Sequence, residues 1–169
     1  MASLEKCLKA IPESAGILII TDGVFSMSGD ICKLDEIVAL AKKYGARVMV
    51  DDAHGFGVLG NCGRGTADYF GLTDQVDIIM STFSKSLASL GGFMAADAQV
   101  IDYARHVSRP FIFSASIPPS NAAAALAALR LLREHPELPK RLAALADYMR
   151  AGLTARGIAI RESATPIIP

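Results

Sequence analysis

Residues 47–54 read RVMVDDAH, and this stretch decides the fold class of the 169-residue chain. Its first half is apolar and rich in valine, which is typical of a strand that is buried in a parallel sheet. Two acidic residues and a histidine follow at once. Polar residues at a strand end either make turns and caps or face the crevice where open α/β sheets bind their ligands.

Similar runs lie on both sides of this stretch. Residues 16–22 form one and residues 76–81 the other, and each ends in polar side chains. Between the first two runs, the apolar spacing predicts an amphipathic helix over residues 34–44, closed by Gly45. Strands that alternate with helices predict an α/β fold with a mainly parallel sheet flanked by helices.

The segments that follow the third strand are short. Residues 92–96 form a fourth β-type run, and a helix is expected from about Ala98 to His106. Residues 111–114, which read FIFS, could be extended.

Two long helices are predicted near the end of the chain. Residues 118–121 open an alanine-rich helix that reaches about Glu134, with Ser120 or Asn121 as a plausible cap. A second helix runs over residues 139–156. The break near His135 is the predicted domain boundary, which divides the chain into residues 1–134 and 135–169.

The composition excludes several classes of protein. The 17 Lys and Arg balance the 17 Asp and Glu, and no basic run indicates nucleic-acid binding. The longest apolar stretch, residues 122–129, is far shorter than the roughly 20 residues of a membrane span. Residues 1–13 lack the apolar core of a secretory signal. Three cysteines without metal-type spacing indicate reduced thiols and a cytoplasmic protein.

Lys85 is the first candidate catalytic residue. It is the only lysine between Lys43 and Lys140, and it lies among hydroxyl groups in the run STFSKS at residues 81–86. Burial there would favour the neutral, nucleophilic amine that Schiff-base chemistry needs, and the hydroxyls could hydrogen-bond a phosphate. The alternative is a strand-end lysine that extends into solvent.

Asp51 and His54 are the next candidates. A carboxylate at the end of a buried strand suits a protonated ring nitrogen, and His54 could hydrogen-bond another substituent of the same ring. A structural histidine is the alternative. Metal binding is not expected, because His106 and His135 lie without ligand spacing.

Residues 55–60 match the pattern G-x-G-x-x-G directly after a strand. A dinucleotide site needs a helix that begins at the last glycine, whereas residues 61–65 continue as a loop. The acidic residue that would bind a ribose should end the next strand, and Asp77 begins it. We therefore expect these glycines to form a permissive loop near the site.

Four ordered motifs carry a resemblance to a known family. They are TDGVFSMSGD at 21–30, VDDAH at 50–54, GRGT at 63–66 and TFSKS at 82–86. Together they resemble the α-oxoamine synthases, a family of fold-type I enzymes that depend on pyridoxal phosphate. The family includes serine palmitoyltransferase, glycine C-acetyltransferase and 8-amino-7-oxononanoate synthase. The similarity runs from about residue 4 to residue 132.

The resemblance implies a role for each candidate residue. Lys85 would hold pyridoxal phosphate as a Schiff base and later remove the α-proton of the bound amino acid. Asp51 would pair with the pyridine nitrogen, and His54 would hydrogen-bond the ring oxygen. Ser26 would lie against the cofactor, and Thr82 would hold its phosphate.

The resemblance also implies a homodimer with shared active sites, because Ala115 and Ser116 match the segment that reaches the phosphate of the other subunit. The reaction would condense an amino acid with an acyl-CoA and release carbon dioxide and CoA, giving an α-oxoamine. Residues 82–93 look most like serine palmitoyltransferase. The other family members, an aminotransferase of the same fold and an inactive half-domain are the alternatives.

The family is more than twice as long as this chain. Residues 1–134 would form part of the large, cofactor-binding domain, and residues 135–169 would begin the small C-terminal domain. The chain lacks counterparts of an upstream phosphate-binding helix and a downstream arginine. It is therefore expected to be inactive alone, and the predicted activity belongs to the complete protein.

Overall fold

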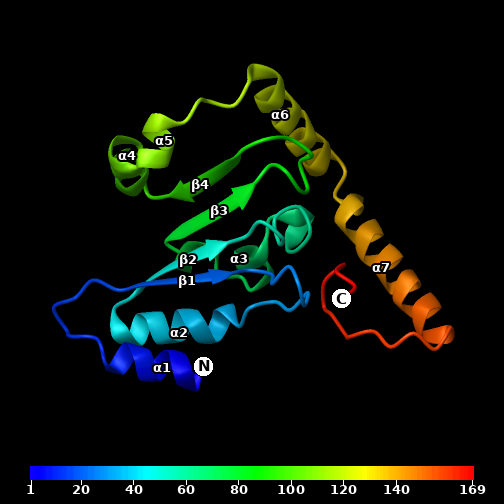
Figure 1. Cartoon of the computed structure of the whole chain (residues 1–169), viewed down its shortest axis with the longest axis horizontal. Helices are drawn as coiled ribbons and strands as arrows, with labels where there is room; N and C mark the ends of the chain where they lie inside the picture. The colour runs from blue at the N-terminus through cyan, green and yellow to red at the C-terminus, as the bar shows by residue number, and fades with distance from the viewer.

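The computed structural model describes residues 1–169 and is built around one four-stranded sheet (Figure 1). Its strands are β1 (Leu18–Asp22), β2 (Arg47–Asp51), β3 (Ile78–Thr82) and β4 (Gly92–Ala96), and they lie side by side in that order. The first three strands are parallel, and β4 pairs antiparallel with β3. The predicted α/β fold with a mainly parallel sheet is confirmed.

The strand register aligns the polar strand ends. Asp22 pairs with Asp51 across β1 and β2, and Asp51 pairs with Met80 of β3. The carboxyl ends of the three parallel strands therefore form one edge of the sheet. Figure 1 shows that this edge points toward α6, α7 and the C-terminal segment.

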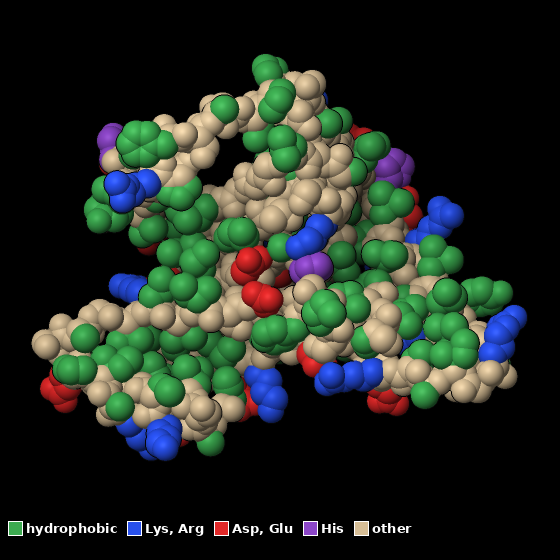
Figure 2. Space-filling view, viewed as in Figure 1, with side chains coloured by type: hydrophobic (Ala, Val, Ile, Leu, Met, Phe, Trp, Pro, Cys, Tyr) green, Lys and Arg blue, Asp and Glu red, His purple; other side chains and the backbone are tan.

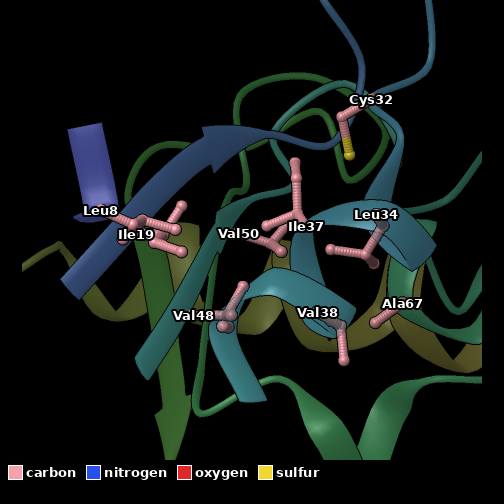
Figure 3. Close-up of a cluster of buried hydrophobic side chains, with 10 residues drawn as sticks. Leu8, Ile19, Cys32, Leu34, Ile37, Val38, Val48, Val50 and Ala67 are labelled. Atoms are coloured by element: carbon pink, nitrogen blue, oxygen red, sulfur yellow. The ribbon is translucent and has the colours of Figure 1, made fainter. Parts of the chain in front are cut away.

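Helix α2 (Leu34–Tyr44) covers one face of the sheet, and α1 (Ala2–Lys9) lies beside it (Figure 1). The apolar face of α2 packs against Val48 and Val50 of β2, both fully buried (Figure 3). Gly45 ends α2 in the left-handed conformation at φ 64°, as the sequence predicts. The sequence analysis did not predict α1, whose only buried residue is Leu8.

The connection from β2 to β3 is compact and irregular. After a turn at residues 52–60 come the 3₁₀ helix η1 (Asn61–Gly63), the four-residue helix α3 (Thr66–Tyr69) and the 3₁₀ helix η2 (Thr73–Gln75). No α-helix begins at the last glycine of the G-x-G-x-x-G pattern. The interpretation of these glycines as a loop is confirmed.

Two helices follow β4, namely α4 (Ala98–Val107) and α5 (Arg109–Phe113). The expectation that residues 111–114 are extended is wrong over 111–113. Ser108 has an extended backbone that ends α4, and Pro110 then lies in the first turn of α5, where its missing N–H costs nothing. Phe111 and Phe113 are 65% and 80% exposed, and neither residue belongs to the sheet.

The last helices are α6 (Pro119–Glu134) and α7 (Glu137–Ala155). Both were predicted, but neither Ser120 nor Asn121 caps α6. Pro118 is the N-cap, because Pro119 already has the fixed φ that a first helical residue needs. His135 separates the two helices, and the division into domains at this point stays a prediction. No helix of the fold has both the length and the hydropathy that a bilayer span needs.

The C-terminal segment, residues 158–169, turns back from α7 toward the loop after β1 (Figure 1). The hydroxyls of Ser163 and Thr165 each donate to the carbonyl of Gly29 at 3.0 Å. The guanidinium of Arg161 donates to the carboxylate of Asp30 at 3.0 Å. These bonds hold the C-terminal segment against the loop that carries Ser26.

Candidate active site

Charged residues from three strand ends meet at the carboxyl edge of the sheet. Asp22 and Asp51 end β1 and β2, His54 follows β2 by three residues, and Lys85 follows β3 by three residues. Asp22, Asp51 and Lys85 all act electrostatically on His54. Figure 2 shows acidic, histidine and basic side chains next to one another at the centre of this face.

A pocket of about 620 Å³ opens beside these groups. His54, Lys85 and Ser86 line its polar side. Leucines of α6 and α7 line the opposite wall, and Thr165 and Ile167 come from the C-terminal segment. The pocket therefore combines a lysine amine and an imidazole ring with a mainly apolar wall, as ligand sites commonly do.

His54 is partly buried, and its surroundings favour the neutral ring. Burial lowers its pKa from the ordinary value of 6.5, and the positive charge of Lys85 lowers it further. The carboxylates of Asp22 and Asp51 oppose this change in the pKa. His54 can therefore donate one hydrogen bond and accept another at neutral pH.

Lys85 is exposed, so the expectation that it is buried is wrong for this chain. It lies in a bend beyond β3 and not in the strand itself. The bend is closed by backbone hydrogen bonds, from Phe83 to Gly91 and from Ser89 to Phe83, both at 2.8 Å. Ala88 has a positive φ of 48° inside it. The bend presents Lys85 at the mouth of the pocket.

Asp51 is partly buried at the end of β2. One of its carboxylate oxygens, Oδ1, accepts the N–H of Ala53 at 3.0 Å. Its backbone carbonyl accepts the N–H of Gly23 at 2.8 Å, which joins the first residues after β1 to the end of β2. The carboxylate is thus oriented from within its own turn.

Thr82 lies at the end of β3, but on the β4 side. It lines a second pocket, of about 640 Å³, together with Gly92, Phe93 and Arg105. Its hydroxyl is buried and has no hydrogen-bond partner. Buried polar atoms without a partner are rare in folded proteins, so this oxygen is available to a ligand.

Neither Asp51 nor Thr82 lines the pocket of His54 and Lys85, and three further predicted site residues lie apart from it. Ser26 is exposed in the loop after β1, between the bridge partners Val24 and Ile31. Ala115 and Ser116 are exposed in the connection between α5 and α6. Their roles stay predictions.

Sequence reasoning gave no role to Asp52. This residue is buried, and its carboxylate accepts two hydrogen bonds from Thr66. The signal was present, since two consecutive acids at a strand end point to opposite faces of the sheet, so one of them must turn inward. Thr165, which completes the pocket from the C-terminal segment, had no sequence signal.

Comparison with known proteins places this site in context. The family model described as aminotransferase class I and II matches residues 1–169. Serine palmitoyltransferase of Bacteroides ovatus is 50% identical over 169 residues, which is 100% of this chain and 43% of the relative. The 8-amino-7-oxononanoate synthase of Thermosipho melanesiensis is 50% identical over 166 residues, which is 98% of this chain and 42% of the relative.

The fold agrees with solved structures of the same enzymes. Serine palmitoyltransferase from S. paucimobilis, solved with a bound PLP–myriocin aldimine, superposes with a TM-score of 0.90 at 40% identity. The match covers 96% of this chain and 42% of that one, so the chain spans less than half the length of its relatives. The predicted resemblance to the α-oxoamine synthases is confirmed. With a family model that matches from the first residue to the last, the chain belongs to the aminotransferase class I and II family.

Proposed function

We propose that this chain carries the central catalytic residues of a pyridoxal phosphate-dependent acyltransferase, an α-oxoamine synthase. The enzyme joins an amino acid to an acyl-CoA with loss of carbon dioxide and CoA. The observation that carries the proposal is the meeting of Lys85 and His54 in one pocket at the carboxyl edge of the sheet, with Asp51 at the end of β2 close enough to act on the charge of His54. Relatives named serine palmitoyltransferase and 8-amino-7-oxononanoate synthase support it.

The donor set fits pyridoxal phosphate. An amine suits its aldehyde, a strand-end carboxylate suits its ring nitrogen, and a neutral imidazole suits its ring oxygen. The buried hydroxyl of Thr82, which lacks a partner, suits a phosphate oxygen. When bound, the cofactor supplies an electron sink for charge that develops on the α-carbon of the amino acid.

Each residue would contribute one step. The negative charge of Asp51 would keep a proton on the ring nitrogen, and His54 would hold the ring oxygen by a hydrogen bond. The Nζ atom of Lys85 would take the α-proton from the substrate, which its position at the pocket mouth allows. Thr82 Oγ1 would donate to the phosphate, and Ser26 would contact the cofactor from the loop after β1.

We also propose a homodimer with shared sites. Ala115 and Ser116 are exposed and follow α5, whose aromatic residues Phe111 and Phe113 are exposed as well. A second subunit that packs here would cover these rings and receive Ala115 and Ser116 at its phosphate site. The three free cysteines support a cytoplasmic location.

The names of the relatives suggest the order in which candidate substrates should be tested. Serine with a long-chain acyl-CoA is tested first, because the relatives from Bacteroides ovatus, Bacteroides thetaiotaomicron and Sphingobacterium spiritivorum are named serine palmitoyltransferase. Glycine with acetyl-CoA and alanine with pimeloyl-CoA follow. Amino transfer to a keto acid is the second candidate reaction, favoured by the description of the matching family model. Release of CoA and carbon dioxide separates condensation from transfer.

The decisive experiment is chemical trapping. The purified protein is mixed with pyridoxal phosphate, reduced with borohydride and digested, and mass spectrometry then locates the pyridoxyl group. We expect the label on Lys85 and none in the Lys85→Ala protein, which should keep its far-ultraviolet circular dichroism because Lys85 is exposed. Label on surface lysines only would contradict the proposal.

A further inference from the structure

Three buried polar residues lie under the polar edge of the pocket. They are Asp52, Thr66 and Ser81, which are 2%, 0% and 0% exposed, and we call them the buried cluster. The proposed function gives none of them a role. Asp52 follows Asp51, Ser81 precedes Thr82, and Thr66 follows the loop of residues 53–65 that contains His54.

The carboxylate of Asp52 is fully engaged by Thr66. Its Oδ2 accepts the backbone N–H of Thr66 at 2.8 Å, and its Oδ1 accepts the hydroxyl of Thr66 at 2.5 Å. These two bonds cross the loop of residues 53–65. The loop that contains His54 is thus closed by Asp52 at one end and Thr66 at the other.

The backbone of Asp52 is hydrogen-bonded both to β3 and to the turn that contains His54. Its N–H donates to the carbonyl of Met80 at 2.8 Å, and its carbonyl accepts the hydroxyl of Ser81 at 3.2 Å. The same carbonyl accepts the N–H of Phe56 at 2.9 Å. The turn over residues 52–56 is therefore anchored at Asp52, directly next to Asp51.

Glycines leave the space that the Asp52 carboxylate occupies. A Cβ atom at Gly23, Gly55 or Gly65 would come within 2.5, 2.2 or 2.0 Å of a carboxylate oxygen of Asp52. Such distances are far inside van der Waals contact, so no larger residue fits without movement. Three backbone segments therefore close around this one side chain. They are the loop after β1, the turn that contains His54, and the end of the loop of residues 53–65.

Burial of the charged carboxylate of Asp52 is energetically unfavourable by itself. Burial raises the pKa of the Asp52 carboxyl, and the hydrogen bonds from Thr66 oppose that change in the pKa. Apolar residues of similar volume commonly fill such a space with equal or better stability. A polar group has the advantage of direction, since its hydrogen bonds fix one arrangement of the three loops.

We propose that Asp52 is a positioning residue, which through Thr66 and Ser81 holds Asp51 and His54 in the arrangement that the cofactor requires. The need for that arrangement rests on the proposed function. The positioning itself is a property of the protein without its cofactor. It can therefore be tested whether or not the cofactor binds.

The test is the pKa of His54 in the cofactor-free protein, measured by an NMR titration of selectively labelled histidines. Thr66→Val removes the hydroxyl donor at nearly constant volume, and Thr66→Ser keeps it. In Thr66→Val the turn loosens and water reaches the ring, so we expect the pKa of His54 to rise toward its ordinary value of 6.5. Thr66→Ser should keep the original pKa, and the exposed residues His106 and His135 should not respond.

Controls separate positioning from a general loss of stability. Leu8→Ala removes buried volume from α1, at the start of the chain, and should lower stability without changing the pKa of His54. Ser81→Ala, which removes only the bond to the Asp52 carbonyl, should move that pKa in the same direction as Thr66→Val. An unchanged pKa in both Thr66→Val and Ser81→Ala would overturn the proposal.

The same proteins are then loaded with pyridoxal phosphate and reduced with borohydride. Label on Lys85 in the unmodified protein, together with an unchanged His54 pKa in the variants, would overturn the positioning role and leave the proposed function standing. A pKa that moves as expected in a protein without label on Lys85 would support the positioning of the turn and count against the proposed function.

Discussion

At the scale of single residues, His54 couples the charge of the site to the stability of the fold. Its pKa is lower in the folded than in the unfolded chain, so between the two values the unfolded chain binds more protons. Stability should therefore be full above about pH 6.5 and fall as the pH drops through the lowered pKa. Urea unfolding of the unmodified protein and of His54→Gln, at pH 7.5 and pH 5.5, measures this contribution, which should be smaller in the variant.

The charges of Lys85 and Asp51 have opposite effects on the pKa of His54. Lys85→Met removes a positive charge and should raise the pKa of His54, whereas Asp51→Asn removes a negative charge and should lower it. NMR titration of the two variants checks both signs. A pKa that stays constant in both variants would mean that these side chains lie too far from the ring to act.

Cys32, which is buried in the hydrophobic core just before α2, offers a second measurement. Burial raises the pKa of its thiol to about 11, and the negative charges of Asp52 and Asp22 contribute. Because the thiolate is the reactive form, Cys32 should resist iodoacetamide at pH 8 in the folded protein, whereas exposed Cys7 should react. Peptide mass spectrometry measures the alkylation rates of Cys32 and Cys7, and addition of urea should make the two rates similar.

The residues of the site were predictable to different degrees. Asp51, His54 and Lys85 were predictable because strand ends of a parallel sheet share one edge, and the structure brings all three to it. The exposure of Lys85 was not, since burial depends on segments that cover the bend from elsewhere in the chain. The alternation of side chains indicates that Asp51 or Asp52 turns inward, but the partner of Asp52, Thr66, lies 14 residues away, and such contacts leave little trace in local pattern.

At the scale of elements, helix α2 shows how a single backbone conformation ends a helix. Gly45 has a φ of 64°, and nothing lies within 4 Å of the place where a Cβ would be. Gly45→Ala should therefore cost about 1–2 kcal/mol through backbone strain alone. Gly16→Ala is the matched control, because it too meets open space but needs no positive φ. Equal urea midpoints for the two variants would contradict this origin of the helix end.

Elements with a strong apolar period were predicted well. The strands β1 to β4 and the helices α2, α4, α6 and α7 lie within a few residues of their expected bounds. Two elements failed for physical reasons. Helix α1 has an apolar stripe, but it is only eight residues long and buries a single residue, so it gives a short signal. Helix α5 has the β-forming residues of a strand but no neighbouring strand to pair with, so a helix satisfies its backbone instead.

At the scale of the whole molecule, the proposed dimer leads to a complementation test. The test uses the complete protein, to which the predicted activity belongs. If Ser116 serves the site of the other subunit, its Lys85→Ala and Ser116→Trp variants should each be inactive alone. A mixed dimer contains one site with neither change, so mixing should restore up to about a quarter of the activity in a random mixture. Acyl-CoA-dependent release of CoA is the measurement. No recovery in a mixture shown to exchange subunits would contradict the shared site.

The bonds from Ser163, Thr165 and Arg161 to the loop after β1 also affect when this loop can become ordered. Arg161 lies 131 residues beyond Asp30, so on the ribosome the loop is made long before its partners. At about 5–20 residues per second, the delay is roughly 7–26 s. During this time the sheet and α2 can assemble from neighbouring segments, while the loop that carries Ser26 waits for the C-terminal segment. The loop that carries Ser26 would therefore become ordered only after the scaffold that supports it has folded.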